Sequence, residues 1–571
     1  MLSSLLLLLL ASLSIRLAAA DDDELPQFNW TSITPARDLE YHDCYNSQFK
    51  CARLLLPINW LDANDTRTTA IAIIKVPATV PESDASFGGA VFTNPGGPGA
   101  SGVEFVLLDG RNMQHRLSRN QNYEIISFDP RGVGNSTPQS ICFDEQLARD
   151  AMVLQMLGSG GLNSGLATVR YTHALIKSYS DVCERSDAKT GPIMGFAGTA
   201  SVARDLVEMV DKTDELRARE GNGRGGGKAR LQYIGFSYGT ILGNYFTSLY
   251  PGRVGRVILD GVADADDYSS RLGWLTNLQD ADAIFDQFFE GCFRAPPSAC
   301  PLKQANDSSA AVIKARVTSY LSSLDTLPLA VMGRDNVRVI TGDYVRRMIG
   351  DAFKFPIYEF RPLATMLAQA MAGNASALVT AFTAASVPKL KRSVGVGRSI
   401  PPYTQINEAS QAVLCSDGQD VRDVSVAQWQ TYIARQVQTS RIYGAYWSEL
   451  RFACSSWPFV SNWRFTGPFG SPSPDAGLKD DRPAAPLLFL SNRLDPVTPL
   501  ASARRMAAGH PGSGLAILED MAHTVFIQNN SCIDGIIHDY LELGIVPAQE
   551  KLCNASCGPW EDCPIERLHL Y

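Results

Sequence analysis

The sequence predicts an α/β protein whose mostly parallel central sheet is interrupted by one large, mainly helical insertion. Short apolar runs alternate with segments of helical spacing up to residue 262 and again from residue 486. That alternation is typical of βαβ units in a parallel sheet. Residues 263–485, in between, are rich in helical patterns. The chain has 571 residues, 45% of them hydrophobic, so it can bury a substantial core.

Each predicted strand is a short apolar run that ends at turn-forming residues. Tyr123–Phe128, for example, is stopped by Asp129-Pro130-Arg131-Gly132. The two clearest helices outside the insertion are residues 201–212 and 532–543, where apolar residues recur on one side. The predicted strands are residues 71–76, 90–93, 123–128, 231–234, 257–260, 486–490 and 515–518.

The first 20 residues are predicted to be a secretory signal peptide. Their apolar run ends in Ala18-Ala19-Ala20 and is shorter than a membrane span, and the acidic Asp21-Asp22-Asp23-Glu24 follows. A signal anchor that stays attached is the alternative. The expected organisation is a signal peptide at 1–20, the first part of the core at 21–262, a helical cap or lid at 263–485, and the second part of the core with a Cys-rich tail at 486–571.

The cysteines and glycosylation sequons also favour export, and we expect a secreted, extracellular protein with no membrane segment after signal cleavage. The 12 cysteines are an even number, as in disulfide-bonded secreted chains. Possible pairs are Cys44/Cys51, Cys142/Cys183, Cys292/Cys300, Cys415/Cys454, Cys532/Cys553 and Cys557/Cys563, although spacing alone does not prove connectivity. Seven Asn-x-Ser/Thr sequons begin at Asn29, Asn64, Asn135, Asn306, Asn374, Asn529 and Asn554. A net charge of −8 argues against a nucleic-acid partner.

Ser237 is the candidate nucleophile. Gly235-Phe236-Ser237-Tyr238-Gly239 matches G-x-S-x-G, a pattern that chance alone can produce in a chain of this length. Here an apolar strand precedes the motif and a helical segment follows it, which is the context of a nucleophile elbow. In that turn small residues let the strand and helix approach, and the hydroxyl projects above the carboxyl end of the sheet. The motif therefore predicts the α/β-hydrolase fold.

A serine hydroxyl needs a base and a group that orients the base. In this fold the order along the chain is Ser, then Asp or Glu, then His. His523 is the expected base because it directly follows a predicted strand, whereas the other late histidines, His510, His538 and His569, do not. Asp495 follows the preceding strand and is the expected acid; Glu519 and Asp520 are alternatives that lie too close to His523 along the chain.

The oxyanion formed during acyl transfer needs hydrogen-bond donors. Asn94-Pro95-Gly96-Gly97-Pro98-Gly99 follows the strand at 90–93, where the fold places its oxyanion loop. Glycines let a backbone N–H point into the site without a side chain in the way. We assign the N–H groups of Gly97 and Tyr238 as the oxyanion hole; a plain turn is the alternative for the glycines.

Together these motifs resemble the prolyl and tripeptidyl aminopeptidase family of α/β hydrolases. The resemblance rests on four motifs and on a C-terminal region similar to that of secreted tripeptidyl aminopeptidases. The motifs are the Gly-rich loop at 94–99 and the segments Asp129–Ser136, Gly235–Thr240 and Arg493–Pro499. It covers most of the mature chain, with the cap matched loosely. Asn94-Pro95 and Ala522 depart from the usual family pattern without removing a reacting group.

The resemblance implies a serine exopeptidase that releases short peptides or single residues from substrates with a free N-terminus. We expect no cofactor, and no zinc site, because none of the cysteine spacings pairs with His in a ligand pattern. Such enzymes generally recognise the substrate's α-amine with acidic groups. Asp417 is one candidate for that role, and a solvated cap carboxylate is the alternative. Two other functions stay open: a secreted carboxylesterase or tailoring hydrolase on the same fold, and a non-catalytic binding or storage protein.

Overall fold

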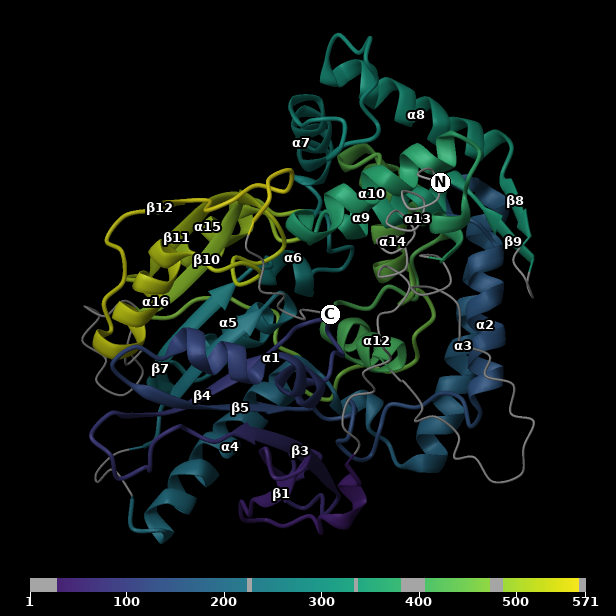
Figure 1. Ribbon diagram of the computed structural model, residues 1–571. Helices are drawn as coiled ribbons and strands as arrows, with labels where there is room; N and C mark the ends of the chain where they lie inside the picture. Colours follow the sequence, from purple (N-terminus) through teal and green to yellow (C-terminus); the bar gives the residue numbers. More distant parts are fainter. Residues whose placement is uncertain (1–27, 223–227, 333–336, 381–405, 473–485, 564–571) are drawn as a thin grey trace, which may run out of the picture.

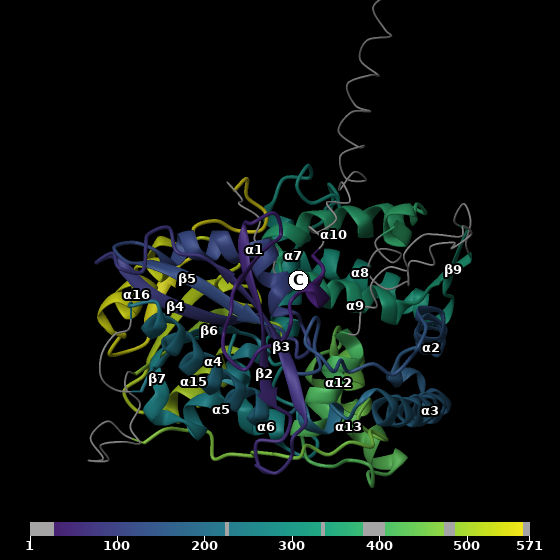
Figure 2. The same ribbon diagram turned by 90° about the horizontal axis from the view of Figure 1, so that it is seen from below.

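The computed structural model describes residues 28–222, 228–332, 337–380, 406–472 and 486–563. The signal peptide predicted at 1–20 lies outside these residues. In the described part of the chain, no helix is long and apolar enough to cross a membrane. Figures 1 and 2 show a wide sheet with helices against both faces and a group of further helices gathered to one side.

Ten strands form one sheet: β1 (His42–Cys44), β2 (Phe49–Pro57), β3 (Thr68–Val76), β4 (Phe87–Asn94), β5 (Asn122–Phe128), β6 (Leu231–Phe236), β7 (Val254–Asp260), β10 (Leu487–Leu494), β11 (Gly514–Met521) and β12 (Lys551–Asn554). Their order is β1-β2-β3-β5-β4-β6-β7-β10-β11-β12. The pairings of β1 with β2, β2 with β3 and β3 with β5 are antiparallel, and all pairings from β5 onward are parallel. The carboxyl ends of the parallel strands therefore meet at one edge, where the candidate site residues lie.

Helices cover both faces of this sheet because both faces of its strands are apolar. One face packs on α1 (Gly102–Leu117) and α16 (Ser531–Leu543), and the other on α4 (Thr199–Arg219), α5 (Tyr238–Leu249) and α15 (Leu500–Ala508). In β3, Ile71 and Ile73 enter one core while Ala72 and Ile74 enter the other. Burial on both faces explains why the strands read as continuous apolar runs.

The mostly parallel α/β architecture predicted from the sequence is confirmed. All seven predicted strands and both predicted helices are present, with their ends shifted by a few residues. The sequence did not reveal β1, β2 or β12, which lie at the two ends of the sheet. β1 and β12 are too short to carry a readable apolar pattern, and the apolar run of β2 is ambiguous between strand and helix.

A pair of helices before α4 was also not expected. α2 (Gln146–Gly158) and α3 (Leu166–Thr190) follow β5 and lie beside the other cap-side helices in both views (Figures 1 and 2). α3 contacts α13 (Val426–Thr439), and Arg149 of α2 pairs with Glu408 of α12 (Ile406–Asp417). This hairpin therefore packs against the insertion, although it falls within the segment assigned to the core.

The segment for which a cap was predicted lies between β7 and β10. It contains α6 (Ala265–Ser269), α7 (Ala281–Arg294), α8 (Ala310–Thr326), β8 (Leu329–Met332), β9 (Val337–Ile340), α9 (Gly342–Ala352), α10 (Pro356–Met371), α12, α13 and α14 (Gly444–Phe452). Helices α7 to α10 share an apolar core of their own. The division of the chain at residues 263 and 485 stays a prediction.

Disulfides close several of these segments, and each of the six pairings considered from the sequence is formed in the structure. Cys532–Cys553 ties α16 to β12. In the tail, Trp560 packs against Phe288 of α7 and Phe360 of α10, and its backbone carbonyl accepts a hydrogen bond from Arg361 at 2.6 Å. The C-terminal tail thus joins the core sheet to the cap-side helices.

Candidate active site

Ser237 occupies a strained turn between β6 and α5. Its φ of 55° lies in the left-handed region, which is uncommon for a residue with a Cβ. The flanking glycines are required by space, since a Cβ on Gly235 would lie 2.3 Å from the carbonyl oxygen of Gly239. The Ser237 N–H donates to the carbonyl of Asp260, at the end of the neighbouring strand β7, at 3.1 Å. This is the strand–turn–helix arrangement expected for a nucleophile elbow.

His523 and Asp495 meet at the carboxyl ends of β11 and β10. The Nδ1 atom of His523 lies 3.0 and 3.1 Å from the two carboxylate oxygens of Asp495. Asp495 is fully buried and accepts hydrogen bonds from the backbone N–H groups of Val497, Thr498 and Thr524, at 3.0, 2.8 and 3.2 Å. Because both Asp495 oxygens are acceptors, Nδ1 carries the hydrogen in this pair, which leaves a lone pair on Nε2.

Thr498 is a member of this arrangement that sequence reasoning missed. Its hydroxyl donates to Asp495 Oδ2 at 2.8 Å and lies 3.1 Å from His523 Nδ1. The signal was available: Thr498 stands three residues after Asp495, the spacing at which an Asp side chain accepts from a following turn. Thr498 therefore restrains both members of the pair.

The loop that carries His523 is fixed by backbone contacts from several elements. Asn492 donates through Nδ2 to the carbonyls of Ala522 and Thr524, at 2.9 and 2.8 Å. The N–H of His523 donates to the carbonyl of Lys354, which lies between α9 and α10, at 3.0 Å. Thr524 has a φ of 72°, a backbone conformation that costs free energy. The hydrogen bonds to this loop offset that cost.

Ser237 and His523 lie in adjoining loops without a direct bond. Within the described residues, no hydrogen bond joins the Ser237 hydroxyl to the His523 ring. Ser237 nevertheless lines the same pocket as Thr498, whose hydroxyl contacts that ring. Such bonds are often long in the absence of substrate and tighten when it binds.

The loop at 94–99 lies against the turn that carries Ser237. Gly96 and Gly97 have φ values of 113° and 103°. A Cβ on Gly96 would lie 2.9 Å from Ser237 Cβ and 3.1 Å from the backbone nitrogen of Tyr238, so no larger residue fits. Gly97 and Tyr238 line one pocket together with Ser237. The two residues assigned as oxyanion donors are thus brought together.

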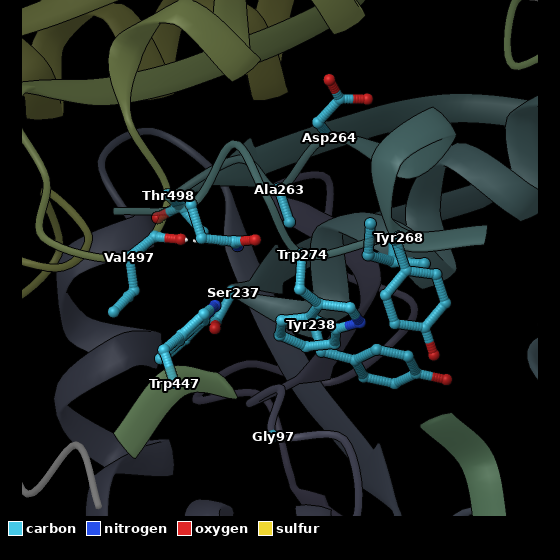
Figure 3. Close-up of a pocket in the computed structure, with 12 residues that line it drawn as sticks. Gly97, Ser237, Tyr238, Ala263, Asp264, Tyr268, Trp274, Trp447, Val497 and Thr498 are labelled. Atoms are coloured by element: carbon cyan, nitrogen blue, oxygen red, sulfur yellow. Dashed lines mark hydrogen bonds between the residues drawn. The ribbon is translucent and has the colours of Figure 1, made fainter. Parts of the chain in front are cut away.

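The pocket above Ser237 is small and walled by aromatic rings. Figure 3 shows Trp447 on one side of Ser237 and the rings of Tyr238, Trp274 and Tyr268 on the other. Ile241 and Val497 add aliphatic surface. The free volume is about 40 Å³, room for a few water molecules at ~10–15 Å³ each. The shape and lining suit a small or apolar group of a substrate.

Asp417, a candidate for recognising a substrate amine, instead accepts hydrogen bonds from three protein donors. Its Oδ1 accepts the Thr199 N–H at 2.8 Å, and its Oδ2 accepts the hydroxyls of Thr199 and of Tyr268, the latter at 2.8 Å. Burial raises the pKa of Asp417 to about 6. Since Gly198 gives α4 no side-chain cap, Asp417 of α12 serves as its N-terminal acceptor. This placement favours a joint between α12 and α4 over amine recognition.

Asp264 is a carboxylate that lines the pocket, and it too is engaged. It caps the N-terminus of α6 by accepting the N–H groups of Asp266 and Asp267, at 3.0 and 3.1 Å. Arg505 lies 3.4 Å from its other oxygen. In Figure 3 the carboxylate of Asp264 points away from Ser237. Burial raises its pKa, although backbone donors and Arg505 oppose the shift.

Comparison with known proteins identifies the class and the family. Residues 89–301 match the family model described as alpha/beta hydrolase fold, and residues 440–553 match the model described as TAP-like protein. A serine protease Hip1 of Mycobacterium tuberculosis is 27% identical over 518 residues, 88% of this chain and 87% of that protein. A tripeptidyl aminopeptidase of Streptomyces lividans is 25% identical over 480 residues, 82% and 78% of the two chains. A carboxylesterase B of Mycobacterium tuberculosis is 25% identical over 558 residues, 92% and 90%.

The protein is therefore a hydrolase with the α/β-hydrolase fold, as its sheet and its nucleophile turn indicated. Within that class, its C-terminal part matches the TAP-like model, and the family resemblance stated from its motifs is confirmed. The relatives align over most of the length of both chains, so the likeness includes the cap-side segment as well as the core.

Proposed function

We propose that this hydrolase is a secreted serine exopeptidase that releases short peptides or single residues from substrates with a free N-terminus. The observation that carries the proposal is the pairing of His523 Nδ1 with the buried Asp495, next to the strained turn of Ser237. Relatives named serine protease and tripeptidyl aminopeptidase support peptides as the substrate class.

In the proposed reaction, Ser237 Oγ attacks the scissile carbonyl carbon while His523 Nε2 takes the hydroxyl proton. Asp495 holds the imidazole and stabilises its protonated form. The C–N bond then breaks, and the amine leaves with the proton from His523. A water molecule, deprotonated by the same imidazole, hydrolyses the ester on Ser237 and releases the N-terminal fragment as an acid.

The N–H groups of Gly97 and Tyr238 are the proposed donors to the oxyanion of each tetrahedral intermediate. Removing one such donor typically costs about 10²–10³-fold in rate. The Tyr238 N–H is at the first residue of α5, where the helix dipole also favours negative charge. The positive φ of Gly97 supports its role, because a residue with a Cβ adopts that conformation only with strain.

The aromatic pocket is the proposed site for the substrate residue that supplies the scissile carbonyl, because it adjoins Ser237 directly. Its apolar lining predicts a preference for small apolar or ring side chains over charged ones. The six disulfides support an oxidising, extracellular location.

A paired substrate tests the exopeptidase function. A tripeptidyl chromogenic amide with a free α-amine is incubated with the enzyme beside the same compound acetylated at its amine. We expect rapid cleavage of the free compound and little of the blocked one, with no turnover of either by Ser237→Ala. Equal cleavage of both compounds would rule out a requirement for a free N-terminus.

A secreted carboxylesterase is the second candidate. The observation in its favour is the relative named carboxylesterase B, which aligns with 92% of this chain. This alternative predicts fast turnover of short-chain esters and none of the peptide amides. The ratio of kcat/KM for an ester and an amide that share one acyl group separates the two functions.

A further inference from the structure

Asp260 is a buried carboxylate at the meeting point of the nucleophile turn and the histidine loop. It is the last residue of β7 and is fully shielded from solvent. The proposed reaction gives it no chemical step. A buried carboxylate costs free energy unless its oxygens are well satisfied, so its position needs a physical reason.

Its contacts supply that reason, because backbone and side chain of this one residue hold two different loops. The Asp260 carbonyl accepts the Ser237 N–H at 3.1 Å. Its carboxylate accepts the Val525 N–H at 2.9 and 3.1 Å on its two oxygens, and the Phe526 N–H at 3.0 Å. Val525 and Phe526 stand two and three residues after His523, so the separation of the two loops is set through a single rigid residue.

We propose that Asp260 is a positioning residue that sets the distance between the Ser237 hydroxyl and the His523 imidazole. The inference rests on the proposed roles of Ser237 and His523. The two loops that carry Ser237 and His523 have no direct bond to each other, so their relative placement needs another contact. The inference names Asp260 as the residue that supplies it. Misplacement of a reacting group by about 1 Å can cost roughly 100-fold in rate.

Few charged groups act on this carboxylate. Burial raises the pKa of Asp260 to about 7, while the N–H groups of Val525 and Phe526 and the nearby His523 and Arg116 oppose that shift. Arg116 of α1 also donates to the Phe526 carbonyl at 2.8 Å, and its guanidinium lies 4.1 Å from the Phe526 ring. The loop is therefore held from the strand side by Asp260 and from the helix side by Arg116.

Asp260→Asn is the informative change because it preserves shape. An amide has one acceptor oxygen, and its NH₂ group would face the backbone N–H donors that the carboxylate now accepts. The pocket residues are untouched. The matched control is Asp187→Asn: Asp187 is also buried and also accepts two backbone N–H groups, those of Ile193 and Met194, at 2.9 and 3.1 Å.

The readouts are kcat and KM on the chromogenic amide and the rate at which a serine-directed fluorophosphonate labels Ser237. We expect Asp260→Asn to lower kcat and the labelling rate by about 100-fold, with KM within about threefold of the wild type. Asp187→Asn should leave all three within about twofold, even if it lowers the melting temperature as much. A purely structural Asp260 predicts that the two variants behave alike.

Labelling also separates this inference from the proposed function. A wild-type protein that resists the fluorophosphonate would contradict the serine mechanism itself. A folded Asp260→Asn that labels as fast as the wild type, or that changes KM in place of kcat, would overturn the positioning role alone.

Should Asp260→Asn fail to fold, Asp260→Glu decides. The extra methylene keeps both acceptor oxygens but moves the backbone N–H groups of Val525 and Phe526 relative to the Ser237 turn, so kcat and the labelling rate should fall while KM stays within about threefold of the wild type. Labelling at the wild-type rate by a folded Asp260→Glu would contradict the proposal.

Discussion

The two sides of the pocket are built differently. On the core side, the carboxylates of Asp495 and Asp260 bind backbone N–H groups at the ends of neighbouring strands, and the loops have few degrees of freedom left. On the cap side, Trp274 and Trp447 present ring surfaces, and within the described residues their indole N–H groups have no hydrogen-bond partner. From this difference we infer that the core side sets the geometry of the proposed reaction and that the cap side sets what can bind.

The largest expected effect tests the core side. Ser237→Ala should lower kcat by about 10⁶-fold because it removes the proposed nucleophile. Binding of a product peptide, measured by calorimetry, should stay within a fewfold of the wild type, since the cap wall is intact. Ser322→Ala, an exposed serine on α8, is the control and should retain full activity. Residual activity above roughly 1% in Ser237→Ala would assign the nucleophile elsewhere.

Asp495→Asn should lower kcat by about 10⁴-fold with little change in KM. The amide can place its NH₂ group toward His523 Nδ1 and so favour the wrong tautomer. The measurement is steady-state kinetics on the amide substrate. A change in KM without a change in kcat would show that Asp495 belongs to binding and would weaken the division between the two sides.

Thr498→Val removes a hydroxyl that contacts both Asp495 and His523 while keeping its shape. A hydrogen bond to a charged group contributes about 1.5–3 kcal/mol, so kcat should fall by roughly 10–100-fold. Thr498→Ser, which keeps the hydroxyl, should recover most of the loss. A loss in Thr498→Ser with none in Thr498→Val would point to packing of the methyl group instead.

Trp447→Phe tests the cap side. Phenylalanine has a smaller ring and no indole N–H, so the variant loses part of the pocket wall and one hydrogen-bond donor. Loss of one hydrogen bond to the substrate should raise KM for the amide by about 3–10-fold, with kcat nearly unchanged. Trp429→Phe is a suitable control, because Trp429 is a buried cap tryptophan that packs against Tyr432 and Phe452. A loss confined to kcat in Trp447→Phe would erase the contrast between the two sides.

The last prediction concerns stability, not activity, at the contact between α12 and α4. Burial raises the pKa of Asp417 to about 6, above its ordinary value of 3.8, so folding favours its protonated form. Its contribution to stability is thus fully present below about pH 4 and is lost as the pH rises through 6, by about 2–3 kcal/mol. Asp417→Asn, which cannot ionise, should lag the wild type in melting temperature most at pH 4 and least at pH 7. A difference in melting temperature between the two proteins that does not change with pH would contradict this prediction.

Much of the core side could be predicted from the sequence because its signals are local. A strand, a G-x-S-x-G turn and a helix lie within a few residues of each other, and His523 and Asp495 each directly follow a strand. Thr498 lies in the same turn as Asp495 and could have been found by its spacing. Asp260 gave no such signal, because its partners at Val525 and Phe526 are more than 260 residues away along the chain.

The cap side resisted prediction for the same reason. Tyr268 and Trp274 lie in and just after α6, whereas Trp447 belongs to α14. These rings meet beside Ser237 only when α6, α14 and the nucleophile turn pack together. The sequence offers Asp417 as a possible amine-binding group, but its hydrogen-bond partners Thr199 and Tyr268 are distant along the chain, so their contacts with it could not be predicted.

The sequence by itself determined the class of fold, and it supplied the proposed order of Ser237, Asp495 and His523 and the proposed oxyanion loop at 94–99. These follow from alternating apolar runs and from short motifs whose backbone geometry is dictated by glycine and by strand ends. Only the tertiary structure decided how far apart the two reacting loops stand, which rings wall the pocket and which buried carboxylates join cap to core. Those features depend on contacts between residues hundreds of positions apart, and no local pattern encodes them.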